Sequence, residues 1–489
     1  MNALRPTDSS ALTIDGKLVP GSAGVFETIN PATEQVLGHA ANANADDMDA
    51  AIAAARAAFD NTDWSRNHAF RARCIRQLRD GLKEHIEELR EITIAEVGAP
   101  RALTTGPQLE GPVNDLGYFA DLAESYVWET DLGHAEPMGI PTRRIVRREA
   151  VGVVGAITPW NFPHQINFAK LGPALAAGCT VVLKPAPDTP WVAALVGKVI
   201  VEETDIPPGV VNIVTSDDHR LGEQLVRDPR VDLVSFTGST RTGKAVMVAG
   251  AETVKKVFLE LGGKSAFVIL DDADIRGAAS MAAFSVCVHA GQGCALNTRL
   301  LVPREHFETA VKAAARTMSG LAPGDPNDGG TMCGPVVSER QRARVEEYIA
   351  LAKAEGGTIV TGGGRPADSE RGYFVEPTLI TGLDNSSRVA QEEIFGPVLV
   401  VIPHDGDDDA IRIANDSPYG LSGSVYGTDP ERIDHVVNGI RTGTLGVNGG
   451  IWYSADAPFG GYKQSGIGRE MGVLGFEEYT ETKLIAYPA

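Results

Sequence analysis

Apolar side chains recur at helical spacing in the first part of the chain. Alanine and spaced apolar residues fill 45–59, and isoleucine and leucine return every third or fourth position through 71–96. Each segment predicts a helix, because a period near 3.6 places these side chains on one face.

Short β-branched runs alternate with helical segments from 151 to 262. Helices are expected at 166–177 and 191–203, where the apolar spacing is helical. Strands are expected at 151–157, 180–183, 210–214 and 231–236, where valine and isoleucine gather. The alternation predicts a parallel sheet, and therefore an α/β fold.

A second unit of the same kind begins near 265. Residues 265–270 predict a strand, and the acidic run at 271–274 supplies caps for a helix that reaches about 288. Alternation continues to about 465. Two segments fit neither unit, namely 143–148, which alternates charged and apolar residues, and 482–489. We expect these two to be strands that pair with each other or with another subunit.

Length and charge limit the class of protein. The chain has 489 residues, too many for one ordinary core, so two or three domains are expected. Its formal net charge of −20 repels phosphate backbones and anionic lipid, so neither nucleic acid nor a membrane surface is an expected partner. No apolar run reaches the roughly 18 residues of a membrane span, and residues 1–8 lack the apolar stretch of a signal peptide.

Cysteine usage indicates a reducing compartment. There are five cysteines, an odd number, and no C-x-x-C pair. That pattern argues against a disulfide framework and against a zinc cluster, so no metal site is expected. A cytoplasmic protein is the simplest interpretation.

The segment 236–244 is a candidate phosphate site. It follows a strand and opens a helix, but it lacks the G-x-G-x-x-G fingerprint of dinucleotide sites. Free N–H groups at a helix start bind phosphate, Gly238 allows a close approach and Ser239 adds a hydroxyl. An ordinary capped turn explains the same residues. Lys184, at the end of another strand, is either a ribose or phosphate contact or a solvated surface lysine.

Cys294 is the candidate nucleophile. It ends the segment Gly291-Gln292-Gly293-Cys294, just beyond an apolar helix, and the two glycines allow a tight turn that exposes a thiol. Inert packing is the commoner fate of a cysteine, and Cys287, on the helix, suits that interpretation.

Two further residues carry candidate chemistry. Glu260 ends a strand among apolar residues, and burial would raise its pKa as a general base requires. The alternative is a surface or salt-bridged glutamate. Asn161 stands between two prolines that pin its loop, so its amide is a candidate oxyanion donor. Ordinary turn chemistry is the alternative there.

The ordered motifs resemble those of the aldehyde dehydrogenase superfamily over nearly the whole chain. They are T-P-W-N-F-P at 158–163, K-P at 184–185, F-T-G-S-T at 236–240, L-E-L-G-G at 259–263, G-Q-G-C at 291–294, G-P at 334–335, E-E-I-F-G-P at 392–397, Asn448, and P-F-G-G-Y-K-Q-S-G at 458–466. Any one motif is weak, but the ordered set is very specific.

The resemblance implies a non-acylating enzyme that oxidises an aldehyde to a carboxylic acid and passes hydride to NAD. Cys294 matches the nucleophile, and Glu260 matches the base that activates the deacylating water. Asn161 matches the oxyanion amide. Lys170 and Glu470 match positions linked to proton relay.

The resemblance also implies cofactor and substrate contacts. Lys184 matches a contact to the adenosine ribose, Ser239 lies at the pyrophosphate site, and Glu393 matches the residue that holds the nicotinamide ribose, with Phe395 beside it. The remaining cofactor residues are Thr158, Pro159, Trp160, Gly238, Gly243 and Leu261. The substrate residues are Phe162, His164, Trp452 and Phe459, of which the aromatic ones indicate an apolar funnel or simple packing.

One departure from the family pattern concerns the cofactor. NAD-using members often carry a glutamate three residues after the lysine, where it binds the adenosine ribose hydroxyls. This chain has Pro187 there, which accepts no hydrogen bond and removes a charge that would repel a ribose phosphate. NADP is therefore a possible second cofactor.

The implied fold has three parts. A Rossmann-like dinucleotide-binding domain takes residues 1–127 and 151–262, and an α/β catalytic domain takes 263–465. A small β element for bridging or oligomerisation takes 128–150 and 466–489, which implies a homodimer or homotetramer.

The same residues also have to be compared with what three alternative functions would require. A relative that acylates coenzyme A usually lacks the water-activating glutamate, whereas Glu260 is present here. A non-catalytic structural member would be signalled by loss of Cys294 or Glu260, and both are intact. A plain thiol hydrolase commonly pairs its cysteine with a histidine. His289 is near in sequence, but its expected helical position indicates packing.

Overall fold

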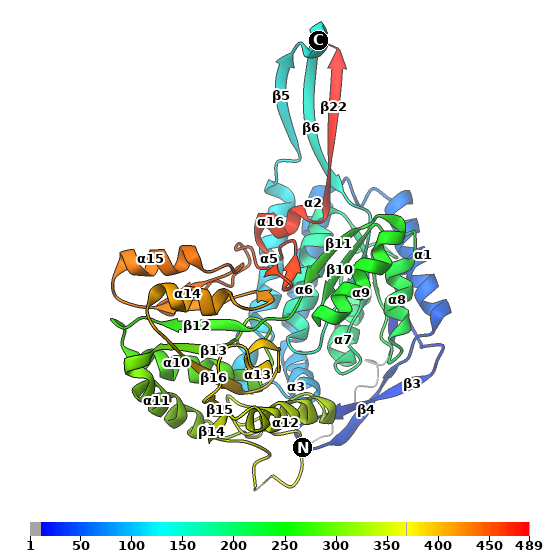
Figure 1. Ribbon diagram of the computed structural model, residues 1–489. Coiled ribbons are helices and arrows are strands. Elements are labelled where there is room, and N and C mark those ends of the chain that lie inside the picture. Colours follow the sequence, from blue (N-terminus) through cyan, green and yellow to red (C-terminus); the bar gives the residue numbers. More distant parts are fainter. Residues whose placement is uncertain (1–10, 368, 489) are drawn as a thin grey trace.

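The computed structural model describes residues 11–367 and 369–488, and its fold is α/β as predicted. The N-terminal residues 1–8, discussed above for a signal peptide, lie outside the described range. Two helix-covered sheets lie side by side, and a three-stranded arm stands out from the body (Figure 1). Within the described residues, no helix is both long and apolar enough to cross a membrane.

The first sheet has eight strands, and its centre is parallel. Valine-rich strands form here because both faces are covered, so alternate side chains enter two separate cores. Val181 and Leu183 pack on one side, whereas Val182 packs on the other. In spatial order the strands are β2 (Lys17–Val19), β1 (Leu12–Ile14), β9 (Val211–Ile213), β8 (Thr180–Lys184), β7 (Val153–Ile157), β10 (Leu233–Thr237), β11 (Lys256–Glu260) and β21 (Gly466–Ile467).

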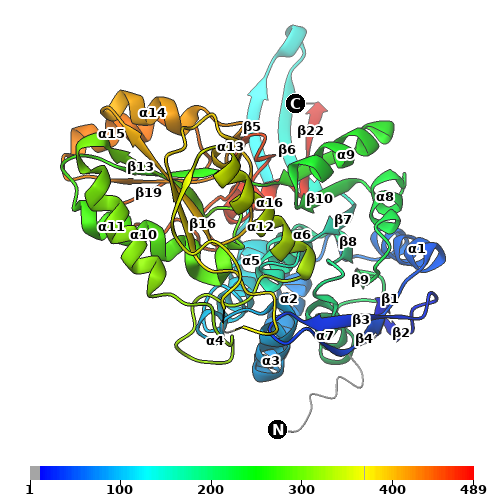
Figure 2. The ribbon, with the colours of Figure 1, turned by 60° about the horizontal axis from the view of Figure 1, so that its bottom comes forward.

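Helices cover this sheet on both sides (Figure 2). One face packs α2 (His68–Glu84), α5 (Glu110–Ser125), α6 (Pro163–Ala177) and α7 (Pro190–Glu203). The other face packs α1 (Ala45–Asn61), α8 (Arg220–Arg227) and α9 (Thr240–Gly250). Smaller elements complete this half: α3 (Ile86–Val97), α4 (Arg101–Thr104), α16 (Gly472–Glu477), and the hairpin of β3 (Val25–Asn30) and β4 (Gln35–Ala41).

The second sheet has seven strands and the same alternating burial. Its spatial order is β14 (Thr358–Thr361), β15 (Thr378–Thr381), β16 (Val398–His404), β13 (Asn297–Pro303), β12 (Ser265–Ile269), β18 (Gly423–Tyr426) and β19 (Gly446–Val447). Its helices are α10 (Ile275–Cys287), α11 (Phe307–Ser319), α12 (Glu339–Ala354), α13 (Arg388–Gln391), α14 (Asp407–Asn415) and α15 (Pro430–Gly439). A short pair, β17 (Tyr419–Gly420) and β20 (Tyr462–Lys463), lies apart from both large sheets.

The arm joins segments far apart in sequence. β22 (Thr480–Pro488) pairs antiparallel with β6 (Thr142–Ala150), which pairs with β5 (Glu129–Ala135). Residues 143–148 and 482–488, which fitted neither α/β unit, therefore pair with each other. This was one of the two alternatives expected from the sequence. Ala489, the end of the predicted segment, lies outside the described residues.

The single helix predicted over 71–96 is wrong, because α2 and α3 are separate helices that meet at His85. The His85 backbone N–H bonds back to the carbonyls of Gly81 and Lys83, which ends α2. Its ring Nε2 lies 2.6 Å from a carboxylate oxygen of Glu203 on α7. Apolar spacing continues through the junction, so the pattern hid the break.

The strand predicted from 151 begins two residues later. Val151 and Gly152 precede β7, and Gly152 has a φ of 131°, outside the extended region of a strand. Glycine adopts that backbone without strain. The apolar character of Val151 reflects packing at the strand's start rather than membership in the ladder.

Candidate active site

The carboxyl ends of the central parallel strands meet at one edge of the eight-stranded sheet. Thr158 follows β7, Lys184 ends β8, Thr237 ends β10 and Glu260 ends β11. Open α/β sheets bind ligands at this edge, where helix starts and strand ends converge. The chain leaves the edge at Glu260 and enters β12 of the second sheet five residues later, so the second sheet adjoins the edge.

Cys294 lies on a turn held against both sheets. α10 ends at Cys287, and a short 3-10 segment at Val288–Gly291 leads into the turn. A Cβ added to Gly291 would lie 2.1 Å from the Gly396 carbonyl oxygen, so only glycine permits this approach. A Cβ on Gly263 would lie 2.6 Å from the carbonyl oxygen of Cys294. The thiol-bearing turn is thereby fixed beside the residues that follow Glu260.

The Cys294 thiol is set apart from the other four cysteines. All five cysteines are free. Four of them are buried, whereas Cys294, taken as a whole residue, is partly exposed. Burial of the sulfur, followed by the nearby charges of Glu260 and Glu393, raises the pKa of the thiol above its usual range. The thiol therefore needs a neighbouring base before it can attack a carbonyl.

Glu260 is a buried carboxyl group. Its side chain is 1% exposed, and neither carboxyl oxygen has a hydrogen-bond partner among the described residues. Burial, then the charge of Glu470, raises its pKa well above the usual value, while Lys170 and Arg469 oppose the rise. The surface and salt-bridged alternatives are thus wrong. A carboxyl group with a raised pKa takes up a proton more readily than an ordinary glutamate, as a general base requires.

Lys170 and Glu470 form a buried ion pair behind Glu260. Lys170 Nζ lies 2.9 Å from Glu470 Oε1 and donates to Ser235 Oγ at 3.0 Å. Ser235 Oγ in turn lies 3.1 Å from the Tyr479 hydroxyl. The residues come from α6, β10 and the C-terminal segment, so three distant parts of the chain build one polar chain.

Asn161 is buried at the entrance to the Cys294 turn. Its Nδ2 donates to the carbonyl oxygen of Gln292 at 3.0 Å, two residues before the thiol. Its backbone carbonyl oxygen accepts from Gln108 Nε2 and lies 2.9 Å from the His289 Nε2. The loop and its side-chain amide are therefore held beside the Cys294 turn, where an oxyanion donor would have to lie.

His289 is not helical, contrary to the expectation. It has a φ of 52° within the 3-10 segment, outside the helical region. Its buried ring bonds the Asn161 carbonyl at 2.9 Å, and burial lowers the pKa of the ring to about 4. His289 thus positions the Asn161 loop. The positive φ that places its ring there was not predicted from the sequence.

The edge of the first sheet suits a dinucleotide. Ser239 caps α9 by accepting from the Thr242 N–H, and the preceding Gly238 N–H donates to the Glu260 carbonyl. The hydroxyls of Thr158 and Thr237 are buried without a partner among the described residues. Buried hydroxyls of that kind require a hydrogen-bonding ligand or water, so the edge fits a polar cofactor.

Lys184 is buried rather than solvated, so the surface alternative is wrong. Its side chain is 5% exposed, and Nζ donates to the Ser216 carbonyl at 3.4 Å. Burial lowers its pKa to about 8, although Asp218 and Asp217 oppose the change. Among the remaining predicted cofactor residues, Pro159 and Trp160 follow β7, Leu261 follows β11, and Gly243 lies in the first turn of α9. A Cβ on Gly243 would lie 2.6 Å from the Leu261 side chain.

Glu393 reaches the same region from the second sheet's side. Its Oε1 accepts from the Gly263 N–H at 3.0 Å, and burial raises its pKa to about 7. Phe395 has a φ of 63° and packs edge-on to Trp160, with ring centroids 5.4 Å apart. The two sheets therefore contribute to one site.

Aromatic rings gather near the catalytic segment. Trp452 stacks on Phe459 at 5.4 Å, and Phe459 pairs through its backbone with Glu470. Phe162 packs edge-on to His289. His164 is fully buried, and its Nε2 lies 2.9 Å from the Thr93 hydroxyl, which favours packing over substrate contact.

Sequence reasoning missed several residues that the structure brings to the site. Ser235 and Tyr479 extend the polar chain behind Glu260. Arg344 Nη2 donates to the Glu393 carbonyl at 2.5 Å. Lys264 is 1% exposed with an unpartnered amine, and its position directly after L-E-L-G-G was the available signal.

Comparisons with known proteins agree with this geometry. The model of the "Aldehyde dehydrogenase family" matches residues 18–485. A 3-succinoylsemialdehyde-pyridine dehydrogenase of a Pseudomonas species is 42% identical over 96% of this chain and 97% of its own length. A Mycobacterium tuberculosis aldehyde dehydrogenase crystallised with NAD+ is 42% identical, with a TM-score of 0.93 and 97% of each chain covered. Aldehyde dehydrogenase C of Pseudomonas syringae, crystallised with NAD+ and octanal, is 39% identical, with a TM-score of 0.93 over 98% of this chain and 97% of that one.

Proposed function

This chain belongs to the aldehyde dehydrogenase family and oxidises an aldehyde with NAD, and from that premise we propose that Cys294 is its nucleophile and Glu260 its general base. The observation that carries the proposal is the Glu260 carboxyl group, which is buried and unpartnered beside the Cys294 turn. Burial is the first cause of the raised pKa of both groups, and the charges of Glu260 and Glu470 raise the pKa of the thiol further.

The first step is attack of the thiolate on the carbonyl carbon, after a base takes the thiol proton. The carbonyl oxygen becomes an oxyanion, and the Asn161 amide and the Cys294 N–H are the donors placed to receive it. Removal of one such donor typically costs about 3–4 kcal/mol of transition-state stabilisation. NAD, when bound, accepts the hydride that leaves the adduct.

The second step is hydrolysis of the Cys294 thioester. Glu260 removes a proton from water, the hydroxide attacks the acyl carbon, and the bond to sulfur breaks, so that the carboxylic acid departs and Cys294 is left as the thiolate. We propose that the Lys170 and Glu470 pair takes up the proton from Glu260, because its charges already perturb the pKa of that carboxyl group.

Replacement of the thiol tests this scheme. Cys294→Ala is expected to abolish formation of free acid, whereas the matched variant Cys74→Ala, which removes a thiol buried in the core, retains it. Free acid is measured without coenzyme A present. Substantial oxidation by Cys294→Ala contradicts the covalent scheme, and acid formation that requires coenzyme A identifies an acylating relative instead.

We further propose that the three parts expected from the sequence have separate roles. Residues 1–127 and 151–262 hold the cofactor, 263–465 carry the nucleophile, and 128–150 with 466–489 bridge subunits. Thr158, Lys184 and Ser239 support the first assignment, because they lie at the carboxyl edge of the eight-stranded sheet.

A homodimer or homotetramer is proposed through the arm. Leu132, Ile140 and Leu484 on the arm are 48%, 61% and 62% exposed, which is unfavourable for apolar side chains left in water. A second copy of the chain would bury them. Light scattering on the purified protein gives the mass, and a monomer contradicts the proposal.

The aldehyde is proposed to be apolar or aromatic, and the location cytoplasmic. The stacked rings of Trp452 and Phe459 support an apolar substrate, and five free cysteines support a reducing compartment. Pro187 leaves NADP as a second cofactor. A panel of aldehydes assayed with NAD and with NADP, with free acid as the readout, tests both the substrate and the cofactor.

A further inference from the structure

Lys264 carries a buried amine that the mechanism above does not use. The residue is 1% exposed, and its Nζ has no hydrogen-bond partner among the described residues. An unpaired buried ammonium costs several kcal/mol of solvation in typical proteins. A group kept at such a cost needs a purpose, and its surroundings indicate one.

Glu393 is the acidic group next to it. The Glu393 carboxyl group lies against the backbone just before Lys264, because Gly263 N–H donates to its Oε1 at 3.0 Å. A Cβ on Gly262 would lie 2.3 Å from its other oxygen. Because Gly262 and Gly263 have no side chains, the Glu393 carboxyl group can approach the backbone directly before Lys264.

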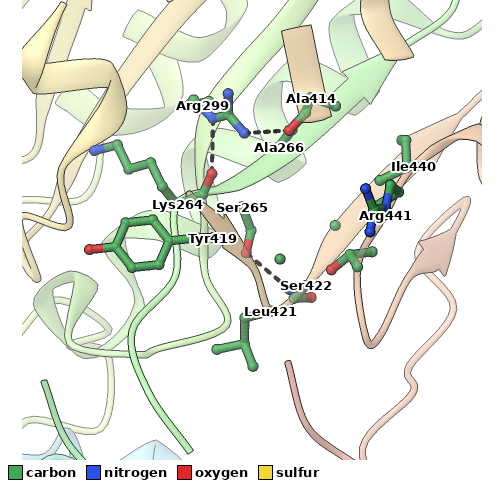
Figure 3. A pocket seen from close by; sticks show the side chains of 13 residues that line it. Lys264, Ser265, Ala266, Arg299, Ala414, Tyr419, Leu421, Ser422, Ile440 and Arg441 are labelled. Atoms are coloured by element: carbon green, nitrogen blue, oxygen red, sulfur yellow. Dashed lines mark hydrogen bonds between the residues drawn. The ribbon is translucent and has the colours of Figure 1, made fainter. Parts of the chain in front are cut away.

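Arg299 closes the opposite side of Lys264. Its guanidinium is fully engaged by the Lys264 carbonyl, Asn385, and the carbonyls of Ile413 and Ala414. Figure 3 shows the Arg299 guanidinium bonded to the Lys264 carbonyl, while the lysine side chain extends to the side on which the Tyr419 hydroxyl also lies. The Arg299 charge therefore adds to burial in disfavouring the charged form of the Lys264 amine.

Charged groups around the amine come from three elements. Burial, then Arg299, lowers the pKa of Lys264 to about 7, whereas Glu393 and Glu392 oppose the change and Arg344 adds to it. Glu393 is perturbed in the opposite direction, by burial first, with Gly263 N–H, Arg344 and Lys264 opposing. Tyr419 faces the same carboxyl group.

We propose that Lys264 is a positioning residue that keeps Glu393 ionised, so that its carboxylate can accept the hydroxyls of the cofactor's nicotinamide ribose. The inference rests on the proposed function, in which Glu393 meets that ribose. Two ribose hydroxyls require two acceptor oxygens, and a protonated carboxyl group offers fewer. Lys264 supplies the positive charge that favours the required form.

NAD binding as a function of pH tests the proposal. Quenching of tryptophan fluorescence by NAD is measured from pH 6 to 9 for the full-length protein, Lys264→Met, and the control Lys312→Met, which alters an exposed lysine on α11. Loss of the Lys264 charge is expected to move the midpoint of NAD binding upward by about one pH unit, since a near opposite charge shifts a carboxyl pKa by that amount or more. At pH 6 the NAD Kd then rises about tenfold, whereas at pH 9 the variants agree.

AMP binding and stability separate this role from a structural one. AMP contacts only the adenosine half, so its Kd is expected to stay the same in Lys264→Met. The thermal midpoint is expected to stay level or rise, because methionine replaces an unpaired buried charge. A shifted NAD profile with unchanged AMP binding supports the proposal.

Other results overturn it. An unchanged NAD profile in Lys264→Met refutes the role of the charge, and so does a profile that changes equally for AMP and NAD. If Lys264→Met does not fold, Lys264→Gln, which is neutral and similar in length, must show the same upward shift. A wild-type protein that binds no NAD refutes the proposed function itself, and is thus distinguished from failure of the Lys264 inference alone.

Discussion

Glu260 and Glu393 are two buried carboxyl groups from opposite sides of one site, and each has a buried lysine nearby. Glu260 has no hydrogen bond of its own, while its lysine, Lys170, is fully engaged by Glu470 and Ser235. Glu393 is held by a backbone N–H, while its lysine, Lys264, has no partner among the described residues.

The difference follows from what each carboxyl group must do. A general base must be free to take a proton, so Glu260 is left without donors and the relay behind it is well ordered. In the proposed role a ribose ligand must stay fixed and ionised, so Glu393 is anchored by the Gly263 N–H, while the Lys264 amine has no hydrogen-bond partner among the described residues. Whether a buried polar group of this site has hydrogen-bond partners thus corresponds to its proposed role.

The largest expected effect comes from Glu260→Gln, which removes the base and leaves the shape. Turnover is expected to fall about 100- to 10,000-fold, the usual contribution of a general base. The burst of reduced NAD, near one per site, should persist, because hydride transfer precedes hydrolysis. Stopped-flow absorbance separates the two phases, and unchanged steady turnover would remove Glu260 from the mechanism.

Lys170→Met is expected to have the next largest effect, on stability. The change leaves Glu470 as an uncompensated buried charge, which typically costs about 3–5 kcal/mol. Denaturant unfolding followed by circular dichroism measures the loss. The double variant Lys170→Met/Glu470→Leu should recover part of it, and no recovery would mean that Lys170 acts through packing alone.

Glu393→Gln should behave in the opposite way and stabilise the fold at high pH. Folding raises the pKa of Glu393 from 4.5 to about 7, so its contribution is fully present below pH 4.5 and is lost as the pH rises through 7. Glutamine has no such loss. The variant should gain about 3 kcal/mol on wild type well above pH 7 and nothing near pH 4.5. Thermal unfolding across that range checks this, and a gap that shrinks with rising pH would reverse the sign.

The same variant is expected to show the smallest effect in NAD binding. Replacement of a charged acceptor by a neutral amide should weaken NAD about tenfold, since hydrogen bonds to charged groups contribute roughly 1.5–3 kcal/mol. Titration calorimetry at pH 8 measures this, with AMP as the ligand that should not change. Equal affinity for NAD would place the nicotinamide ribose elsewhere.

The sequence predicted the α/β fold and most strands to within two residues, and it offered the pairing of the two arm segments with each other as one of two alternatives. Period and composition suffice there, because each strand or helix records its burial in its own residues. The break at His85 escaped because two helices with one apolar face in line show a single period. At the break the His85 ring contacts Glu203, more than a hundred positions away, and no local pattern in the sequence reports such a contact.

The chemistry of individual side chains was harder to predict. Glu260 and Lys184 each allowed an exposed and a buried interpretation, and only the packing of distant segments decided between them. The positive φ of His289 depends on the fit of its turn against neighbouring segments, and no local residue announces it. The position of Lys264 directly after L-E-L-G-G was the only local signal, because the lack of a partner for its amine depends on the segments packed around it.

The position of Glu470 and Tyr479 near the end of the chain has a consequence for biosynthesis. A ribosome releases the N-terminal segments first. β21, which completes the edge of the eight-stranded sheet, and Glu470, the partner of Lys170, are both synthesised after Cys294. On the proposed mechanism the thiol is therefore made before its base relay, so a chain terminated between Cys294 and Glu470 would carry the thiol without the relay.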